Sequence, residues 1–252
     1  MFSIAIVSGT GGAGRTTVAA GLASMLARRG RPALALDFDP QNALGLALGL
    51  APEEGDGVAR RMVNGGRWHE AAFQNSDGVR FLPFGATAEA ERRAFEARLA
   101  GEPGWLPARL AEVELPGDTV MVADTPRLPA AAARAVIESV DLVIAVLTPD
   151  TQSYARLPVL RELAGGRAPL FYLVNQFDAT RRLQNDVIAL LRPDLGASLI
   201  PYLVHRDEAV PEATASNRSL AEQAPHSQAA HDLQGLASWV VGQARSIRGE
   251  PL

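Results

Sequence analysis

Cysteine and lysine are both absent from the sequence, and each absence removes a class of function. Without cysteine the chain can form no disulfide and no thiolate metal cluster, and it has no cysteine nucleophile. All 24 basic residues are arginine, so a site that ordinarily uses lysine must use arginine here or lose the charge. No apolar run approaches the length of a membrane span, and no basic region precedes the apolar N-terminal run, so we expect a cytoplasmic protein.

Length and composition are those of an ordinary folded protein. With 252 residues, of which 47% are hydrophobic and 21% charged, the chain is expected to form one large domain over residues 1–252. The formal net charge of −4 argues against a protein that coats nucleic acid, so we expect no specific nucleic-acid partner.

A glycine-rich segment near the N-terminus carries the strongest functional pattern. It follows the apolar run Phe2–Val7, a predicted buried strand, and its letters GTGGAGRT at 9–16 fit the phosphate-loop pattern G-x-x-x-x-G-K-[ST], except that Arg15 replaces the lysine. Glycines let backbone N–H groups converge on a phosphate, and Thr16 offers the hydroxyl that such loops use for Mg²⁺. The alternative is a plain tight turn between a strand and a helix, and the spacing favours phosphate binding.

Apolar segments alternate with helical patterns over the whole length, which predicts an α/β fold with a doubly wound, mostly parallel sheet. Strands are expected at Ala33–Leu36, Val79–Pro83, Thr119–Asp124, Leu142–Leu147, Leu170–Val174 and Leu199–Val204. Helices are expected at Arg15–Arg29, Ala88–Leu99, Tyr154–Leu163, Arg181–Leu191 and Ala229–Ile247, with a short helix capped by Asn42 and a helical turn in the loop 52–66.

Carboxylates stand at the ends of two predicted strands, where ligands bind in open α/β sheets. Asp37 and Asp39 follow one strand, and Asp124 ends another in the letters VMVADTP. Asp124 fits a Walker B carboxylate that holds Mg²⁺ through its water shell. The alternative, that Asp39 and Asp124 simply begin turns before prolines, is weaker because both belong to the same sheet edge as the glycine loop.

Together, the segments SGTGGAGRTT, LALDFDPQN and VMVADTP resemble the deviant Walker A ATPases of the ParA/MinD superfamily over essentially the whole chain. The resemblance implies a P-loop NTPase fold of the MinD type (the SIMIBI class) that binds ATP and Mg²⁺ between two subunits. It implies catalytic roles for Asp39, which orients water, and Arg15. It implies Mg²⁺ binding by Thr16, Asp37 and Asp124. The nucleotide contacts that it implies are Gly11, Gly12, Ala13, Gly14, Arg15, Thr16 and Thr17 at the phosphates and Asn175 and His205 at the adenine.

Two further segments, RWHEAAFQNSDGVRFLPFG at 67–85 and YLVHRDEAVPEA at 202–213, are similar to the BcsQ (YhjQ) family encoded with bacterial cellulose synthase. This resemblance implies a homodimeric switch that assembles or localises the cellulose secretion complex, with partners such as BcsR and BcsE. A terminal apolar stripe at Leu233, Leu236, Val240, Ala244 and Ile247 is expected to dock on the protein's own core. The alternative is a peripheral contact with the inner membrane.

The loop departs from the superfamily at two positions, and both departures predict weak or no ATP hydrolysis. Relatives carry a lysine that reaches the partner's nucleotide where this chain has Thr10, and a second lysine where it has Arg15. Phosphoryl transfer depends mainly on positioned charge, so binding can survive where fast turnover does not. A ParA-type DNA-partitioning ATPase is the alternative function. A metabolic enzyme on the same fold is a third, and relatives with a bridging iron–sulfur cluster are excluded by the missing cysteines.

Overall fold

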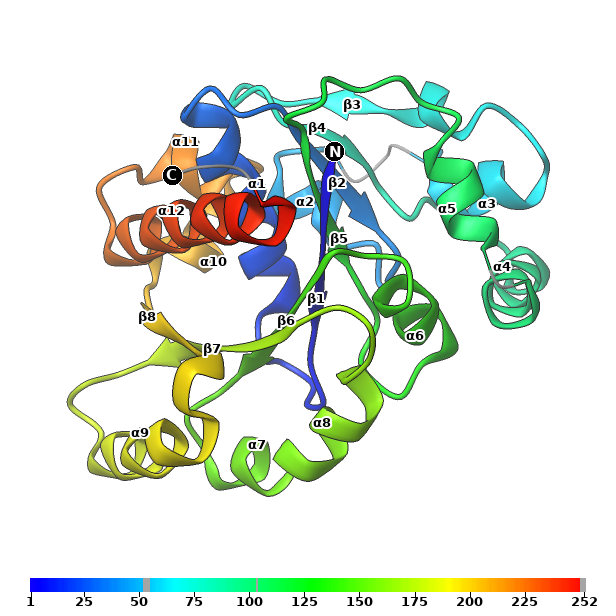
Figure 1. The fold of residues 1–252 in the computed structure, drawn as a ribbon. Helices are drawn as coiled ribbons and strands as arrows, with labels where there is room; N and C mark the ends of the chain where they lie inside the picture. The colour runs from blue at the N-terminus through cyan, green and yellow to red at the C-terminus, as the bar shows by residue number, and fades with distance from the viewer. Residues whose placement is uncertain (52–54, 103, 250–252) are drawn as a thin grey trace.

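A computed structural model describes residues 1–51, 55–102 and 104–249 of the chain. These residues form an eight-stranded sheet with the order β3-β4-β2-β5-β1-β6-β7-β8 (Figure 1). Every neighbouring pair is parallel except β3 and β4, which are antiparallel. The predicted doubly wound, mostly parallel sheet is confirmed.

The strands are β1 (Phe2–Val7), β2 (Ala33–Asp37), β3 (Phe73–Gln74), β4 (Arg80–Leu82), β5 (Val120–Asp124), β6 (Leu142–Leu147), β7 (Leu170–Phe177) and β8 (Leu199–His205). The α-helices are α1 (Arg15–Arg28), α2 (Leu44–Ala47), α3 (Val58–Val63), α4 (Glu89–Gly101), α5 (Trp105–Leu110), α6 (Ala131–Ile137), α7 (Thr151–Ala155), α8 (Leu157–Ala164), α9 (Arg182–Leu195), α10 (Ala209–Ala215), α11 (Leu220–Gln223) and α12 (Gln228–Arg248).

Two apolar cores lie on opposite faces of the sheet, because side chains alternate between the faces along each strand. On β1, Ile4 and Ile6 enter a core with helices α1, α2, α11 and α12, whereas Ala5 and Val7 enter a core with helices α3 to α6, α8 and α9. The helices lie accordingly on both sides of the strands (Figure 1). Strands buried on both faces read as continuous apolar runs, which is why they were recognisable in the sequence.

Several local expectations were wrong, and side-chain contacts explain the first. Asn42 does not cap α2: it has φ 51°, and its Oδ1 accepts the N–H of Gly85 at 3.0 Å. The expected helix 154–163 is divided into α7 and α8, and β7 continues past Val174 to Phe177. By contrast, the helical turn expected within 52–66 is confirmed as α3 (Val58–Val63), and residues 52–54 of that segment lie outside the described residues.

The terminal helix α12 packs on the sheet and on α1, as its apolar stripe predicts. Leu233, Leu236 and Val240 are fully buried, whereas Ile247 in the last turn is 41% exposed. A Cβ on Gly21 of α1 would lie 2.5 Å from a methyl of Leu233, so the two helices meet closely at this glycine.

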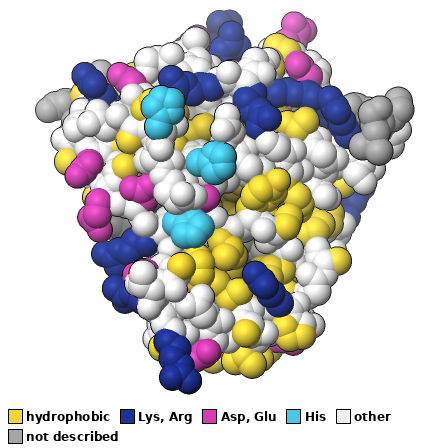
Figure 2. Space-filling model, turned by 90° about the vertical axis from the view of Figure 1, so that its left-hand side faces the viewer, with side chains coloured by type: hydrophobic (Ala, Val, Ile, Leu, Met, Phe, Trp, Pro, Cys, Tyr) yellow, Lys and Arg dark blue, Asp and Glu magenta, His cyan; other side chains and the backbone are white. Residues whose placement is uncertain are grey.

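Some apolar side chains remain on the surface near the β8 edge of the sheet. Figure 2 shows hydrophobic groups among histidines and charged groups on the side of the molecule at the left of Figure 1. Leu183 and Leu190 of α9 and Tyr202 of β8 are the exposed large hydrophobic residues of these two elements. Within the described part of the chain, none of the helices combines the length and the hydropathy needed to cross a bilayer.

If α12 contributes to the core, truncating its central leucine must destabilise the fold. We expect Leu233→Ala to lower the free energy of unfolding by about 2–5 kcal/mol, because the buried side chain leaves a cavity. The matched control Leu190→Ala, on an exposed position of α9, should change it by less than about 0.5 kcal/mol. Denaturant unfolding measures both, and equal small effects would show that α12 is not docked.

Candidate functional site

The glycine loop joins the end of β1 to the first turn of α1 at the centre of the sheet. Gly14 is the N-cap of α1 with φ 86°, a left-handed conformation that glycine adopts without strain, and no side chain caps the helix. The first N–H groups of α1 therefore remain free of a side-chain cap and can bind an anion, with the helix dipole favouring negative charge. The loop has the geometry expected of a phosphate-binding loop.

Two side-chain amides from β7 hold the outer side of this loop. Asn175 Nδ2 donates to the carbonyl of Ala13 at 2.8 Å, and Gln176 Nε2 donates to the carbonyl of Gly12 at 2.6 Å. A Cβ on Gly14 would lie 2.2 Å from Asn175 Nδ2, so only glycine fits there. Successive strand residues normally face opposite ways, and the φ of 60° at Gln176 is what brings both amides to the loop.

Three carboxylates gather beneath the loop at the carboxyl ends of β2 and β5. Asp37 and Asp124 are opposite one another in the parallel register, and Thr16 Oγ1 donates to Asp124 Oδ2 at 2.6 Å. Burial raises the pKa of Asp124 to about 7, although the Thr16 hydrogen bond opposes the shift. Burial, followed by the charge of Asp124, raises the pKa of Asp37 well above its ordinary value. The sheet thus holds two acidic groups where each disfavours ionisation of the other.

Arg15 turns away from the loop toward the third carboxylate. Its Nη2 lies 3.2 Å from Asp39 Oδ2, and its Nη1 donates to the carbonyl of Thr125 at 2.5 Å. Both charged side chains are mostly covered, with 14% and 11% of their surface exposed. The two residues with predicted catalytic roles are therefore an ion pair with each other.

The oxygen ligands around Thr16 suit a magnesium ion that the protein binds only in part, rather than a metal ion held entirely by protein side chains. Asp124 Oδ1 is buried without a hydrogen-bond partner, beside the Thr16 hydroxyl, and such oxygen ligands are those that Mg²⁺ prefers. Asp37 is less available as a metal ligand, since its two oxygens accept the N–H groups of Asp39 at 2.9 Å and Leu44 at 3.1 Å. Within the described ranges, no three His, Asp or Glu side chains form a cluster that could hold a metal ion by themselves.

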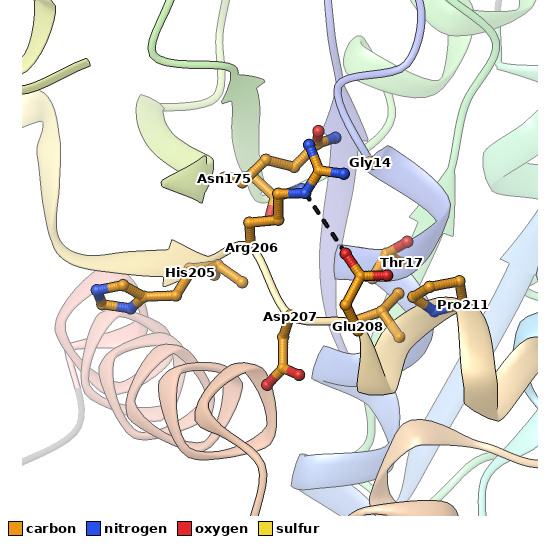
Figure 3. Close-up of a pocket in the computed structure, with 11 residues that line it drawn as sticks. Gly14, Thr17, Asn175, His205, Arg206, Asp207, Glu208 and Pro211 are labelled. Carbon is orange, nitrogen blue, oxygen red and sulfur yellow. Dashed lines mark ion pairs between the residues drawn. The ribbon is translucent and has the colours of Figure 1, made fainter. Parts of the chain in front are cut away.

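A cleft of about 220 Å³ opens beside the loop, between α1, the end of β7 and the segment that follows β8. Gly14, Thr17 and Asn175 line one side, and Arg206 and Pro211 line the other (Figure 3). The cleft begins at the helix end of the loop, so it can accept the base and sugar of a nucleotide whose phosphates lie on the loop. The predicted contacts Thr17, Asn175 and His205 all line it.

The imidazole of His205 points away from the cleft toward α12 (Figure 3). Its Nδ1 lies 2.8 Å from Asp232 Oδ2, and its backbone N–H donates to the same oxygen at 2.9 Å. Asp207 likewise accepts the N–H of Ala229 at 2.9 Å, so the segment that follows β8 is tied to α12 and forms a cleft wall.

Sequence reasoning missed Gln176, the cleft wall at Arg206 and Pro211, and Arg127 near the loop. For Gln176 the sequence carried no signal, because a positive φ at a residue other than glycine is not readable from composition. Arg127 stands three residues after the Walker B aspartate, and this position was the one signal available for it.

Comparison with solved structures defines the class of the fold. The septum site-determining protein MinD from Pyrococcus horikoshii, solved with Mg-ADP, superposes with a TM-score of 0.75 at 22% identity and covers 98% of both chains. The sheet order, the glycine loop and the carboxylates at the strand ends therefore belong to a P-loop NTPase fold of the MinD/ParA type.

Comparison of sequences defines the family. A model of the family described as cellulose biosynthesis protein BcsQ matches residues 1–241, and the chain belongs to this family. The BcsQ of Escherichia coli K12 is 27% identical over 233 residues, which span 91% of this chain and 90% of that protein. The chromosome-partitioning ATPase Soj of Thermus thermophilus is 29% identical over 257 residues and 96% of both proteins.

The buried carboxylates predict how stability depends on pH. An Asp carboxyl ionises near 3.8 when unfolded, whereas the pKa of Asp124 in the fold is about 7. Between these values the folded chain binds more protons than the unfolded chain, so stability falls as pH rises toward 7 and then levels off. We expect the melting temperature of the nucleotide-free protein to drop by about 3 °C or more between pH 6 and pH 8.

The variant Asp124→Asn removes one of the two titrating groups, so its melting temperature should drop less between pH 6 and pH 8 than that of the wild type. Asp186→Asn, at an exposed position on α9, is the matched control and should behave as the wild type. A wild-type melting temperature that rises from pH 6 to pH 8 would contradict this electrostatic description.

Proposed function

We propose that the protein is an ATP-binding dimeric switch that assembles or localises the bacterial cellulose synthase secretion complex, with weak or no ATP hydrolysis. The observation that carries the proposal is the glycine loop, whose carbonyls are held by Asn175 and Gln176 while its helix end stays uncapped. Membership of the BcsQ family supports the cellulose role. The MinD structure from Pyrococcus horikoshii is a complex with Mg-ADP, which supports binding of an adenine nucleotide with magnesium.

Each part of the nucleotide has a complementary surface. The N–H groups of Gly14 to Thr17 face the phosphates, and the cleft between Thr17 and Pro211 takes the base. Thr16 and Asp124 would hold Mg²⁺, whose charge offsets the phosphates and relieves the crowding of Asp124 and Asp37. Asp39 would orient the attacking water, and its carboxylate is paired with Arg15.

In the proposed assembly, two copies of the chain form a homodimer and share ATP between their facing glycine loops. Its partners would be cellulose synthase subunits such as BcsR and BcsE, with peripheral rather than spanning contact with the inner membrane. With Leu233, Leu236 and Val240 buried, the large hydrophobic side chain that α12 exposes for a membrane contact is Ile247 in its last turn.

A ParA-type DNA-partitioning ATPase is the second candidate, favoured by the 29% identity to Soj. DNA binding would need a surface of unpaired basic residues, and many surface arginines here are paired. Arg92 and Arg93 both contact Glu89, for example, and Arg61 contacts Asp56 and Glu70. Binding to duplex DNA that falls steeply with salt concentration would favour this candidate.

Binding of Mg-ATP is the first expected outcome. Calorimetry should show saturable binding that requires Mg²⁺, and Thr16→Ala should weaken it by about 10-fold or more, because a hydroxyl ligand and its bond to Asp124 are lost. The control Thr180→Ala removes a hydroxyl from an exposed loop and should leave the affinity unchanged. Full affinity in Thr16→Ala would refute the site, and light scattering of the same samples should show a doubled mass only with ATP.

Slow turnover is the second expected outcome. Thr10 carries no cation and Arg15 is engaged by Asp39, and loss of one such electrostatic group commonly costs ~10²–10³ in rate. The double variant Thr10→Lys, Arg15→Lys should therefore hydrolyse ATP at least about 10-fold faster than the wild type in a steady-state phosphate-release assay. The two single variants are the controls. Brisk wild-type hydrolysis that Asp39→Ala abolishes would show that Arg15 is an adequate substitute.

A further inference from the structure

Neither residue that replaces a superfamily lysine presents a free positive charge to the loop. Thr10 has no charge, and its backbone is engaged by Ser8 Oγ, which accepts its N–H and donates to its carbonyl, both at 3.1 Å. The guanidinium of Arg15 is engaged by Asp39 and the carbonyl of Thr125. A bound triphosphate would thus meet backbone N–H groups but no uncommitted cation from the loop itself.

Arginines from elsewhere in the chain lie beside the loop, Arg156 with its Cδ 3.8 Å from a Cβ placed on Gly9 and Arg127 with its guanidinium near Gly11. A Cβ placed on Gly11 would lie 3.8 Å from Nη1 of Arg127, so the guanidinium is beside the loop backbone without clashing with it. Arg127 is exposed, and within the described ranges its side chain makes no hydrogen bond and no ion pair. Its donors are therefore free for a ligand.

The backbone on both sides of Arg127 is fixed to the strand that leads into the loop. Thr125 Oγ1 donates to the carbonyl of Ile6 at 2.7 Å, and Leu128 N–H donates to the carbonyl of Ser8 at 3.0 Å. Leu128 itself is buried. The exposed arginine is thus carried by an anchored segment, which limits the entropy lost when its side chain binds.

The order of groups along the site indicates which phosphate Arg127 would meet. The cleft for the base touches the loop at Gly14, and Thr16 with Asp124 marks the metal position. Gly11 stands three residues before Gly14, toward β1, and neither Gly11 nor Arg127 lines the cleft. A nucleotide with its base in the cleft would direct its phosphates along the loop away from Gly14, so its last phosphate rather than its first would lie nearest Arg127.

We propose that Arg127 binds the terminal phosphate of the nucleotide and makes the site distinguish a nucleoside triphosphate from a diphosphate. The planar guanidinium can give two parallel hydrogen bonds to phosphate oxygens, which suits recognition of a terminal group. The inference rests on the proposed function, since it requires that ATP bind to this loop. It gives the chain a cation in place of the charge that is missing at Thr10.

The test compares the affinities of ATP, ADP and AMP, each with Mg²⁺, for the wild type and three variants by calorimetry. Arg127→Ala should lose about 10- to 100-fold in affinity for ATP, as expected for charge-assisted hydrogen bonds, with a much smaller loss for ADP and none for AMP. Arg127→Lys should recover part of the loss. Arg134→Ala, which removes the same charge from an exposed position on α6, should match the wild type.

Each outcome decides between the two proposals. If wild type binds ATP and Arg127→Ala binds it equally well, this inference is overturned and the proposed function stands. An equal loss for ATP, ADP and AMP would also overturn it, because a general disturbance of the loop does not select the last phosphate. If the wild type binds none of the three nucleotides, the proposed function fails, and this inference fails with it.

Discussion

The nucleotide site depends on two hydrogen bonds that reach the glycine loop from a strand elsewhere in the sheet. Asn175 and Gln176 of β7 bind the carbonyls of Ala13 and Gly12, and β6 lies between β7 and the strand that leads into the loop. In a trans peptide the N–H points opposite to the carbonyl, so fixing these two carbonyls turns the N–H groups of Ala13 and Gly14 the other way. Hydrogen bonds from β7 therefore set the conformation of the loop. Its N–H groups are left on the opposite side, where an anion can bind.

A second constraint is the charge gathered under that loop. Asp37 and Asp124 end adjacent parallel strands, and in the fold each is too buried to ionise at its ordinary pH. The one cation of the loop, Arg15, compensates Asp39 instead. The buried carboxylates therefore carry an electrostatic cost that a bound cation would relieve, while the proposed water-directing group, Asp39, is restrained by Arg15. Both properties suit a protein whose action depends on whether its ligand is bound, rather than on catalytic turnover.

The sheet and the position of the loop and carboxylates at its carboxyl edge could be predicted from the sequence, because buried parallel strands are continuous apolar runs and the loop has a fixed spacing. Asp37, Asp39, Asp124 and Thr16 were placed correctly at one edge for that reason. What could not be predicted depends on side-chain direction. The turn of Arg15 toward Asp39 and the left-handed backbone at Gln176 are decided by packing partners far away in the sequence.

The crowded carboxylates also bear on how long the protein lasts in a cell. A ligand that binds only the folded chain lowers the fraction of molecules that are open at any moment, and proteases cleave the open ones. A phosphate-bound dication would add to this by neutralising Asp124, whose buried, unpartnered oxygen lies at the carboxyl end of β5. The loaded protein would outlast the empty one, and the amount of protein available would follow the supply of nucleotide.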